Sequence, residues 1–567
     1  MAEYLSPGVY VEEYDSSPRS IEGVGTSTAG FIGLTERGQS VGAPVLVTNF
    51  ADYQRKFGGY LSEYTHGDFR FLPYSVEQFF ANGGTRCFIS RVVPADAKAA
   101  KAKQGILTFT ATNEGKWGNR INISFIASNK RKMQLVAADD GNDKVFTAKT
   151  TSGFAEGDIV EFAGEYNRIS TIFDRTVTFE KAFASSPVDE AIVPKVFVYS
   201  AEMDIIVRCD DIAEVYNDVS LNVSSPNYIV KRLGSSDTVN FTIKDTNEID
   251  NPVSLVFGTG ILKGTVSFAG GTDGNTANVD AGVFIGENKG PGKRTGIEAF
   301  VENNVVSIIA VPGVTIPEVV VSLVAHCERE KNRFAVIDIP AAYTKVDEIA
   351  EYRNMIDSTY AAMYHPWVRV FDRLSKKPLF IPPSGSVAGV YSRTDISRGV
   401  HKAPANETVA CTGLSVNYTT GEQDILNPIG VNLIRALPGQ GIRVWGARTA
   451  SSDSNFKYVN IRRLFIFVEE SIKNNTNWVV FEPNNSSLWA RVQMTISSFL
   501  ETLFRGGMFA GETPGESYFV DIGTGTMSQD DIMNGRLICN IGIAPSRPAE
   551  FVIFRVTQFT SEAGGGE

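Results

Sequence analysis

The sequence predicts a multidomain protein of mixed α/β and α+β class, built around a central and largely parallel sheet. Three observations lead to this prediction: the length of 567 residues, a strand–helix–strand pattern in residues 300–371, and a series of short strands and turns in residues 130–200. A chain of this length exceeds one ordinary domain. Its composition, 43% hydrophobic and 21% charged, is typical of globular proteins with substantial cores.

The central sheet is predicted from apolar strands that alternate with amphipathic helices. VVSIIAV and RFAVIDIP have the pattern of buried strands, and the helical segment TIPEVVVSLVAHCEREKNR lies between them. VDEIAEYRNMIDSTY predicts another helix, and AAMYHPWVRVFD predicts a third strand. Strand–helix–strand units at this spacing form right-handed crossovers, which place the strands parallel in one sheet. Near the C-terminus, YVNIRRLFIFVEESIKNNTN and SSLWARVQMTISSFLETLFRGGMF predict two further helices.

Residues 130–200 have a different sequence pattern from the segments on either side. KVFTAKT, GDIVEF, NRISTIF and RTVTFEKAF are short strand patterns separated by closely spaced turn signals. This pattern predicts a small all-β module inserted into a larger domain. The segment DDGNDK within it lacks the spacing and the terminal glutamate of a calcium loop, and it predicts a plain turn.

Both ends of the chain have the alternation of β-strands. Near the N-terminus SPGVYVEEY places valines on one face, and near the C-terminus AEFVIFRVTQFT does the same with valine and phenylalanine. The strand residues are Val9, Tyr10, Val11 and Glu12 at the first end and Phe551, Val552, Ile553, Phe554, Arg555, Val556 and Thr557 at the second. A terminal strand needs a partner for its backbone N–H and C=O groups. The sequence leaves open whether the two strands pair within one subunit or between subunits.

Charge and cysteine usage exclude several classes of function. The net charge is −11, and no block of lysine and arginine suggests contact with nucleic acid. The sequence shows no secretory signal and no apolar run long enough to cross a membrane, so we expect synthesis and folding in a cytoplasm. The five cysteines are widely spaced, which predicts buried thiols and no disulfide framework or zinc site.

The carboxyl ends of the predicted parallel strands are the positions where a hydrolytic site would lie. Asp338 ends RFAVID, and PPSGSVAG presents Ser384 and Ser386, which together resemble the aspartate and serine segments of subtilisin-like hydrolases. The four histidines all lack the glycine-flanked motif of those enzymes, and a serine without a positioned base is not activated. We therefore expect no catalytic residue; Asp338 is predicted to cap a neighbouring turn and the Ser-Gly run to form a tight loop.

Cofactor sites are not predicted either. GENKGPGKRTG has Glu287 and Arg294 where a phosphate loop needs glycine and Ser or Thr, and PGQG lacks the third glycine of a dinucleotide fingerprint. Arg462–Arg463 and Glu469–Glu470 are predicted to lie on a solvated helix face, with Glu469 reaching Lys473. The sequence thus predicts no cofactor and no metal.

Short segments spread along the chain resemble the contractile tail sheath family, which includes the sheaths of contractile phage tails, phage-like bacteriocins and related injection systems. The matching segments, in family order, are SPGVYVEEYDSSPRSIEGVGTSTAGFIG, NEGKWGN, FAGGTDG, RFAVIDIP, YHPWVRV, PPSGSVAGVYSRTDISRGVHKAPAN, VWGART, YVNIRRL, WVVFEPNN, LWARV and APSRPAEFVIFRV. They cover nearly the whole chain, with 130–200 as the main variable part.

The resemblance implies a domain organisation. A strand arm and linker at 1–20 precede the first part of the sheath core at 21–129, the inserted β module at 130–200 and a mixed α/β segment at 201–270. The expected later parts are a subtilisin-like α/β domain at 271–440, an inner, tube-facing C-terminal sheath domain at 441–548, and a strand arm with a flexible tail at 549–567. Sheath proteins contain a subtilisin-like region without being proteases, which agrees with the incomplete triad.

The family also implies a structural function. Its subunits stack as hexameric rings around an inner tube, in a metastable extended state, and contraction drives the tube through a target envelope. The expected partners are other copies of the chain, the inner tube protein, and baseplate and tail terminator proteins, without direct nucleic-acid contact or membrane insertion. The particle would be made in a bacterial host cytoplasm and would be a virion tail or an injection particle.

In such sheaths the terminal arms pair with strands of neighbouring subunits, so the residues 9–12 would be donated and 551–557 would offer a partner edge. Ordering ten arm residues costs roughly 10–20 kcal/mol of backbone entropy, whereas burial of two valines supplies only about 3–6 kcal/mol. The free arm should therefore order only against a neighbour. A helix from Trp489 to Gly507, with Arg491 and Arg505, is expected to face the tube. A serine hydrolase and a binding module that does not polymerise are the alternatives from other classes.

Overall fold

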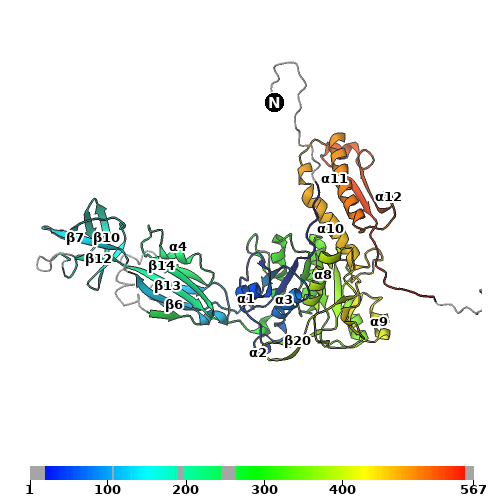
Figure 1. The fold of residues 1–567 in the computed structure, drawn as a ribbon, viewed down its shortest axis with the longest axis horizontal. Helices are drawn as coiled ribbons and strands as arrows, with labels where there is room; N and C mark the ends of the chain where they lie inside the picture. The colour runs from blue at the N-terminus through cyan, green and yellow to red at the C-terminus, as the bar shows by residue number, and fades with distance from the viewer. Residues whose placement is uncertain are drawn as a thin grey trace, which may run out of the picture.

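The computed structural model describes residues 20–104, 107–128, 130–185, 187–188, 196–243 and 264–555 of the 567-residue chain. An α/β core lies at the centre, two β-rich units extend from one side of it, and a helical C-terminal unit stands on another (Figure 1). The chain is therefore a mixed α/β multidomain protein, as the sequence predicts at this level.

The core is built on a nine-stranded sheet whose six central strands are parallel. The order is β2 (Val45–Val47), β3 (Cys87–Arg91), β1 (Ala29–Gly33), β17 (Ile308–Ala310), β18 (Phe334–Asp338), β19 (Ala361–His365), β24 (Val431–Leu437), β25 (Gly441–Val444) and β22 (Glu407–Thr408). Strands β1, β17, β18 and β19 are buried along their whole length. Continuous apolar runs such as FAVID are typical of parallel strands covered on both faces.

Helices cover both faces of this sheet. Successive residues of a strand point to opposite sides, so Phe334 belongs to one apolar cluster and Ala335 to the other. The first face carries α1 (Phe50–Phe57), α3 (Leu72–Ala81) and α8 (Ser384–Arg398). The second carries α5 (Ala281–Ile285), α6 (Pro317–Glu330), α7 (Val346–Arg353) and α9 (Thr420–Leu426). The short helix α2 (Glu63–His66) precedes α3.

The segment PPSGSVAG is helical, so the predicted tight loop is wrong. It forms the first turns of α8, where Gly385 and Gly389 face α3. A β-carbon on Gly385 would overlap the carbonyl oxygen of Ser75, and one on Gly389 would overlap that of Phe79. The small residues therefore allow a close crossing of two helices. Such a crossing depends on residues far away in the chain, which explains why local composition suggested a loop.

The segment AAMYHPWVRVFD forms two strands in place of the single predicted one. Strand β19 ends at His365, and β20 (Val368–Asp372) leaves the main sheet to pair with β21 (Lys377–Ile381) and β23 (Gly413–Leu414). Pro366 stands between them and cannot donate a ladder hydrogen bond, which favours a break at this position.

A β-rich middle unit follows the core along the extension. One sheet contains β14 (Ile212–Val219), β13 (Glu202–Cys209), β6 (Asn122–Ser128) and β16 (Gly264–Ser267), and the other contains β15 (Val239–Ile243), β5 (Leu107–Ala111) and β4 (Lys101–Gln104). The helix α4 (Ile229–Leu233) packs beside them. Phe109, Trp117 and Phe125 are buried in their common core.

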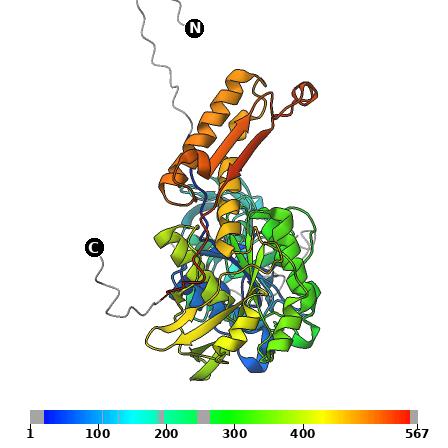
Figure 2. The ribbon, with the colours of Figure 1, turned by 90° about the vertical axis from the view of Figure 1, so that its right-hand side faces the viewer.

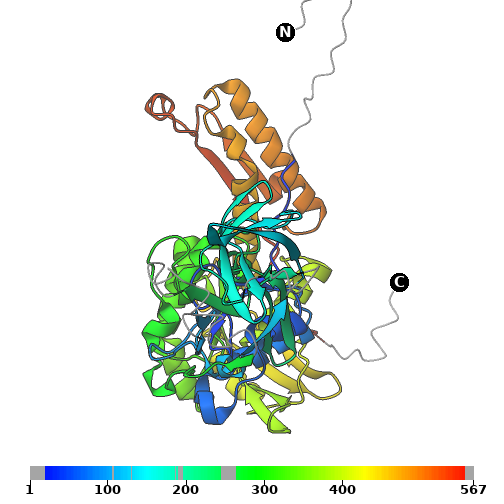
Figure 3. The same cartoon turned by 90° about the vertical axis from the view of Figure 1, so that its left-hand side faces the viewer.

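A six-stranded closed barrel lies at the far end of the extension in Figure 1 and faces the viewer in Figure 3. Its strands are β7 (Lys132–Asp139), β8 (Asn142–Ala148), β9 (Ile159–Phe162), β10 (Glu165–Phe173), β11 (Thr176–Phe179) and β12 (Phe197–Ser200). Phe146, Phe179 and Phe183 pack edge to face inside it. Closure leaves a barrel with no free strand edge.

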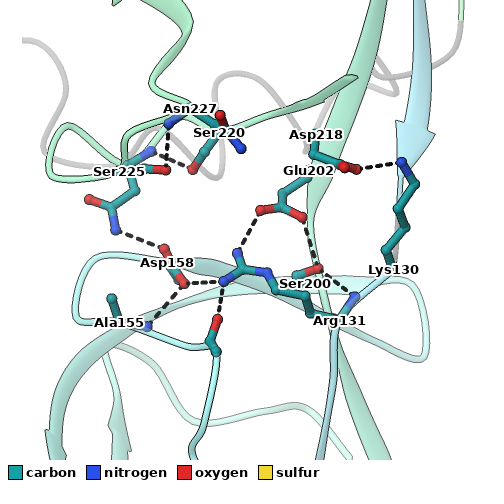
Figure 4. A network of polar contacts seen from close by, with 12 residues as sticks. Lys130, Arg131, Ala155, Asp158, Ser200, Glu202, Asp218, Ser220, Ser225 and Asn227 are labelled. Carbon is teal, nitrogen blue, oxygen red and sulfur yellow. Dashed lines mark hydrogen bonds and ion pairs between the residues drawn. The ribbon is translucent and has the colours of Figure 1, made fainter. Parts of the chain in front are cut away.

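Charged side chains join the barrel to the middle unit (Figure 4). Arg131 donates to Glu202 at 2.6 Å and to Asp158 at 3.3 Å, and Lys130 pairs with Asp218 at 2.7 Å. Burial of the Glu202 carboxyl raises its pKa. Because Asp158 belongs to the barrel and Glu202 to the middle unit, Arg131 bridges the two.

The C-terminal unit consists of two long helices and a small sheet (Figure 2). Its elements are α10 (Val459–Asn475), α11 (Ser486–Arg505), α12 (Pro514–Ser517), β26 (Tyr518–Ile522), α13 (Gln529–Met533) and β27 (Cys539–Ile543). Leu464, Val492, Leu500 and Phe509 lie in its apolar cluster. In the part of the chain that the structure describes, no helix is both long and apolar enough to cross a membrane.

Candidate assembly site: a two-stranded sheet and the roots of two arms

The sheet of the C-terminal unit contains only β26 and β27 among the described residues. The strands are antiparallel, with Tyr518 opposite Ile543, and Val520 and Ile522 turn toward the apolar cluster that includes α11. Each strand has one edge whose backbone groups face no ladder partner within this sheet. A two-stranded sheet is marginal in water, and an open edge is a template for another strand.

The first described residues of the chain run along α10, and we call residues 20–28 the N-terminal root. Ile21 is buried in the apolar cluster of the C-terminal unit. The backbone N–H of Val24 donates to Ser471 Oγ at 3.1 Å, and Asn475 Nδ2 donates to the Glu22 carbonyl at 3.0 Å. The predicted strand at 9–12 lies outside the described residues.

A buried ion pair supports the same helix. Arg463 binds Asp395 with two hydrogen bonds, of 2.9 and 2.6 Å, and donates to the Thr26 carbonyl at 2.9 Å. Both side chains of the pair are 3% exposed. The guanidinium also lies over the ring of Tyr391, 4.8 Å from its centroid. The pair thus joins α10, α8 and the N-terminal root.

The predicted solvated face of α10 is therefore wrong. Arg462 and Arg463 are buried, and Arg462 stacks on Phe456 at 3.6 Å from the ring centroid. Lys473 pairs with Glu470 at 3.0 Å, whereas Glu469 was expected. The helix connects the α/β core to the C-terminal unit (Figure 1), so surfaces that would face water on an isolated helix are covered.

Residues 544–550, which follow β27, form a second root, which we call the C-terminal root. After β27 the Ser546 N–H donates to the Met508 carbonyl at 3.3 Å, and the chain then passes to the α/β core. There Glu550 accepts hydrogen bonds from Arg448 at 2.8 Å (twice), Asn427 at 2.8 Å and Tyr458 at 2.7 Å. These donors, Arg448 above all, hold the pKa of the Glu550 carboxyl at about 2 in spite of the opposing effect of burial.

The predicted strand residues directly after this root are exposed. Phe551, Val552, Ile553 and Phe554 are 72%, 68%, 80% and 85% exposed, and residues 551–555 form no strand in the structure. Val556 and Thr557 lie outside the described residues. Four consecutive large apolar side chains in water are unusual for a folded chain and indicate a surface that a partner covers.

The predicted tube-facing residues lie on α11. Arg491 is 55% exposed and pairs with Glu482 at 3.2 Å; Arg505 is 76% exposed and pairs with Glu501 at 2.8 Å. Trp489 donates from Nε1 to Asn484 at 2.7 Å. The two arginines are accessible to a partner, and their present ion pairs are of the weak, exposed kind.

The Asp338–Ser384 pair is structural in its geometry. The Ser384 hydroxyl donates to Asp338 at 2.6 Å, and the carboxylate also accepts the N–H groups of Ser384 and Gly313. Burial raises the pKa of Asp338 to about 6 although these hydrogen bonds oppose the shift. Asp338 thus caps the start of α8, close to the predicted role. The Nε2 of His365 pairs with the Tyr418 hydroxyl at 2.9 Å, whereas the Ser384 hydroxyl donates to Asp338.

Sequence reasoning missed the C-terminal root. The only local signal is a single glutamate between Pro548-Ala549 and an apolar strand pattern, and its partners are 92 to 123 positions away. A metal site is likewise not indicated: the described part of the chain contains no group of three or more His, Cys, Asp or Glu side chains that could hold an ion.

Comparisons with known proteins agree on one family. The family model for the phage tail sheath protein central domain matches residues 286–450, and the model for the phage tail sheath C-terminal domain matches residues 451–559. The prophage major tail sheath protein of Pseudomonas aeruginosa (strain UCBPP-PA14) is 26% identical over 294 residues, which are 50% of this chain and 73% of that protein. The tail sheath protein of Salmonella phage ViI is 26% identical over 44% of this chain and 40% of its own length.

Solved structures give a similar result. The sheath complex of an extracellular contractile injection system (PVC) in its contracted state has a TM-score of 0.53 and 22% identity, and the match covers 99% of this chain and 100% of that one. A sheath tail protein from Listeria innocua has a TM-score of 0.53 and 13% identity over 93% of this chain and 96% of its own. At these identities the likeness establishes the fold.

Proposed function

Because the chain belongs to the contractile tail sheath family, we propose that it polymerises by exchanging its terminal arms with neighbouring copies. Its matched relatives are tail sheath proteins, which are structural subunits of phage tails or injection particles and not enzymes. In the proposed assembly the subunits stack as hexameric rings around an inner tube, and contraction of the stack drives the tube through a target envelope.

One observation carries this proposal: among the described residues the chain has a sheet of only two strands, whose outer edges meet no further strand apart from the Gln493 hydrogen bond to the Val520 carbonyl and the Phe509–Pro545 bridge, and it has exposed apolar residues beyond a fixed root. The edges of β26 and β27 offer N–H and C=O groups to an incoming strand, as in β-augmentation. The arm segments 9–12 and 551–557 have the alternating pattern that such a strand needs. Donor and acceptor surfaces differ, so the contact is head-to-tail and generates rings or helical polymers.

The first test is electron microscopy of three forms of the purified protein. We expect tubular polymers from the full-length chain and from a control that lacks only residues 561–567. We expect only monomers from a form that lacks residues 1–15, because it has no N-terminal strand to donate. Equal polymerisation of the full-length chain and of the form that lacks residues 1–15 would show that the N-terminal arm is not needed for assembly. Failure of every form, even with the inner tube protein, would contradict the proposal.

For the inner partner we propose the exposed face of α11 that carries Arg491 and Arg505. Their long cationic side chains suit an acidic tube surface, and both are more than half exposed. The double variant Arg491→Ala/Arg505→Ala should lower co-assembly with the tube protein while sheath–sheath polymers persist. Arg536→Ala, on the same unit, is the control. Unchanged co-assembly of the double variant would remove this face from the proposal.

Three further parts of the proposal follow from membership of the family. They are contacts with baseplate and terminator proteins, a subtilisin-like α/β core, and synthesis in a bacterial cytoplasm. Solved relatives include sheath and baseplate complexes, which supports self-association and attachment to a baseplate for this chain.

A further inference from the structure

The carboxylate of Glu550 has all its acceptor positions filled. Oε1 accepts from Asn427 Nδ2 and Arg448 Nε, and Oε2 accepts from Arg448 Nη2 and the Tyr458 hydroxyl. A carboxylate has about four acceptor positions, and a bidentate arginine is its strongest partner. The Glu550 side chain is only 19% exposed and that of Arg448 only 7%. This is a built socket on the α/β core, which we call the Glu550 socket.

The socket is fixed independently of Glu550. The Arg448 backbone N–H donates to Asn432 Oδ1 at 2.7 Å, and its side chain donates to the Asn427 carbonyl at 3.1 Å. Asn432 is fully buried on β24. Tyr458 is the residue before α10. Glu550 therefore docks onto groups that the sheet and two helices already hold in place.

The chain on either side of Glu550 is held less firmly. Upstream, the nearest backbone anchors are the Phe509–Pro545 bridge and the Ser546 hydrogen bond, and Arg547 and Ala549 are exposed. Downstream, Phe551 to Phe554 are at least 68% exposed. Loss of the Glu550 contact would thus move the point of attachment from residue 550 back to residue 546.

We infer that Glu550 is the positioning residue of the C-terminal arm: it fixes where and in which direction residues 551–555 leave the α/β core. This inference rests on the proposed function, because it concerns the arm that a neighbour would engage. A tethered strand binds at an effective concentration that depends on tether length and stiffness. Binding of Glu550 in the socket shortens the mobile segment between the core and the arm. It also transmits tension from a bound arm to the α/β core as well as to β27.

Docking of Glu550 in the socket can be measured without polymerisation. The assay is chymotrypsin digestion of the full-length protein at a dilution where it is monomeric. Cleavage after Phe551 requires Glu550 to enter the protease cleft, whereas cleavage after Phe554 does not. Glu550→Gln should raise the ratio of Phe551 to Phe554 cleavage about tenfold, since it weakens charge-assisted hydrogen bonds. Arg448→Lys should act in the same direction, and Tyr458→Phe should give a smaller increase. Glu351→Gln, an equal charge change on an exposed part of α7, should leave the ratio unchanged.

The second readout separates donation from acceptance. Glu550→Gln subunits keep the β26–β27 edges, so they should add to wild-type polymers but extend them less readily than wild-type subunits do. The mean polymer length in mixtures should fall as the variant fraction rises, and the variant alone should need about tenfold more protein to polymerise. A merely destabilised subunit would be diluted out without capping.

An unchanged cleavage ratio in Glu550→Gln would overturn the inference, and so would wild-type assembly of that variant. Failure of the proposed function has a different result: wild-type protein would not polymerise, while the cleavage ratio would still respond to Glu550→Gln.

Discussion

The two roots hold their arms by opposite means. At the N-terminal root, side chains of α10 bind backbone atoms of Glu22, Val24 and Thr26, so the identity of those residues matters little. At the C-terminal root, a side chain of the arm itself, Glu550, enters a socket on the core. The first root should tolerate substitution of Glu22, Val24 and Thr26 and depend on the helix. The second should depend on one residue of the arm.

The roots also differ in what they attach to. The N-terminal root lies in the apolar cluster of the helical unit through Ile21, and the C-terminal root ends on Arg448, on Asn427 at the end of α9 and on Tyr458 at the start of α10. A neighbour that pulls on the two arms would therefore load two different parts of the subunit. Four substitutions test this difference between the roots, and they follow in order of expected effect.

Asp395→Ala should have the largest effect, because it leaves Arg463 buried without its counter-charge. Breaking a buried pair by removing one partner costs about 3–5 kcal/mol. The midpoint of urea unfolding should fall accordingly, and the N-terminal root should loosen with it. Glu482→Ala, from the exposed pair with Arg491, should cost less than about 1 kcal/mol. Equal costs for the two variants would show that the Arg463 pair does not support the root.

Ile21→Ala should destabilise the C-terminal unit by about 2 kcal/mol, near the lower end for buried Ile→Ala changes because the site lies at the edge of its cluster. Chemical denaturation followed by tryptophan fluorescence measures the change. Val480→Ala, at a 63% exposed position of the same unit, is the control. An effect no larger than that of the control would mean that the root is held by hydrogen bonds alone.

The contribution of Glu550 should depend on pH only in strong acid. Its pKa is lowered from 4.5 to about 2, so the stabilisation is present above pH 4.5 and is lost as the pH falls toward 2. The difference in thermal midpoint between wild type and Glu550→Gln should stay constant from pH 7 to about 4.5 and shrink below it. A difference that disappears already at pH 5 would contradict the socket geometry.

Ser471→Ala should have the smallest effect. It removes the hydrogen bond from the Val24 N–H and the one that the hydroxyl donates to the Phe467 carbonyl, which is already bonded within the helix, and it costs about 1 kcal/mol. Ser498→Ala, on the exposed side of α11, is the matched control, and unfolding midpoints compare the two. A cost above that of Ile21→Ala would reverse our ranking of packing over hydrogen bonding at this root.

Local patterns predicted the elements whose cause is local. The strand RFAVIDIP is β18, the helix after TIP is α6, and SSLWARVQMTISSFLETLFRGGMF contains α11, because apolar spacing alone specifies them. Distant partners explain the misses. Gly385 and Gly389 fit against α3, about 310 positions away, and Glu550 meets Arg448 across 102 positions. The local sequence around these residues does not indicate which distant residues they contact. The donated strands themselves remain predictions.

The way the barrel joins the middle unit determines how the barrel could be exchanged for another domain. Arg131 and Ser200 are hydrogen-bonded neighbours, with Ser200 N–H donating to the Arg131 carbonyl at 2.8 Å. The chain therefore enters and leaves the barrel at two adjacent points. A foreign domain in place of residues 132–199 would need adjacent ends, and it would also have to replace the contacts that Ile159 makes in the core of the middle unit and that Asp158 makes with Arg131 and Asn222.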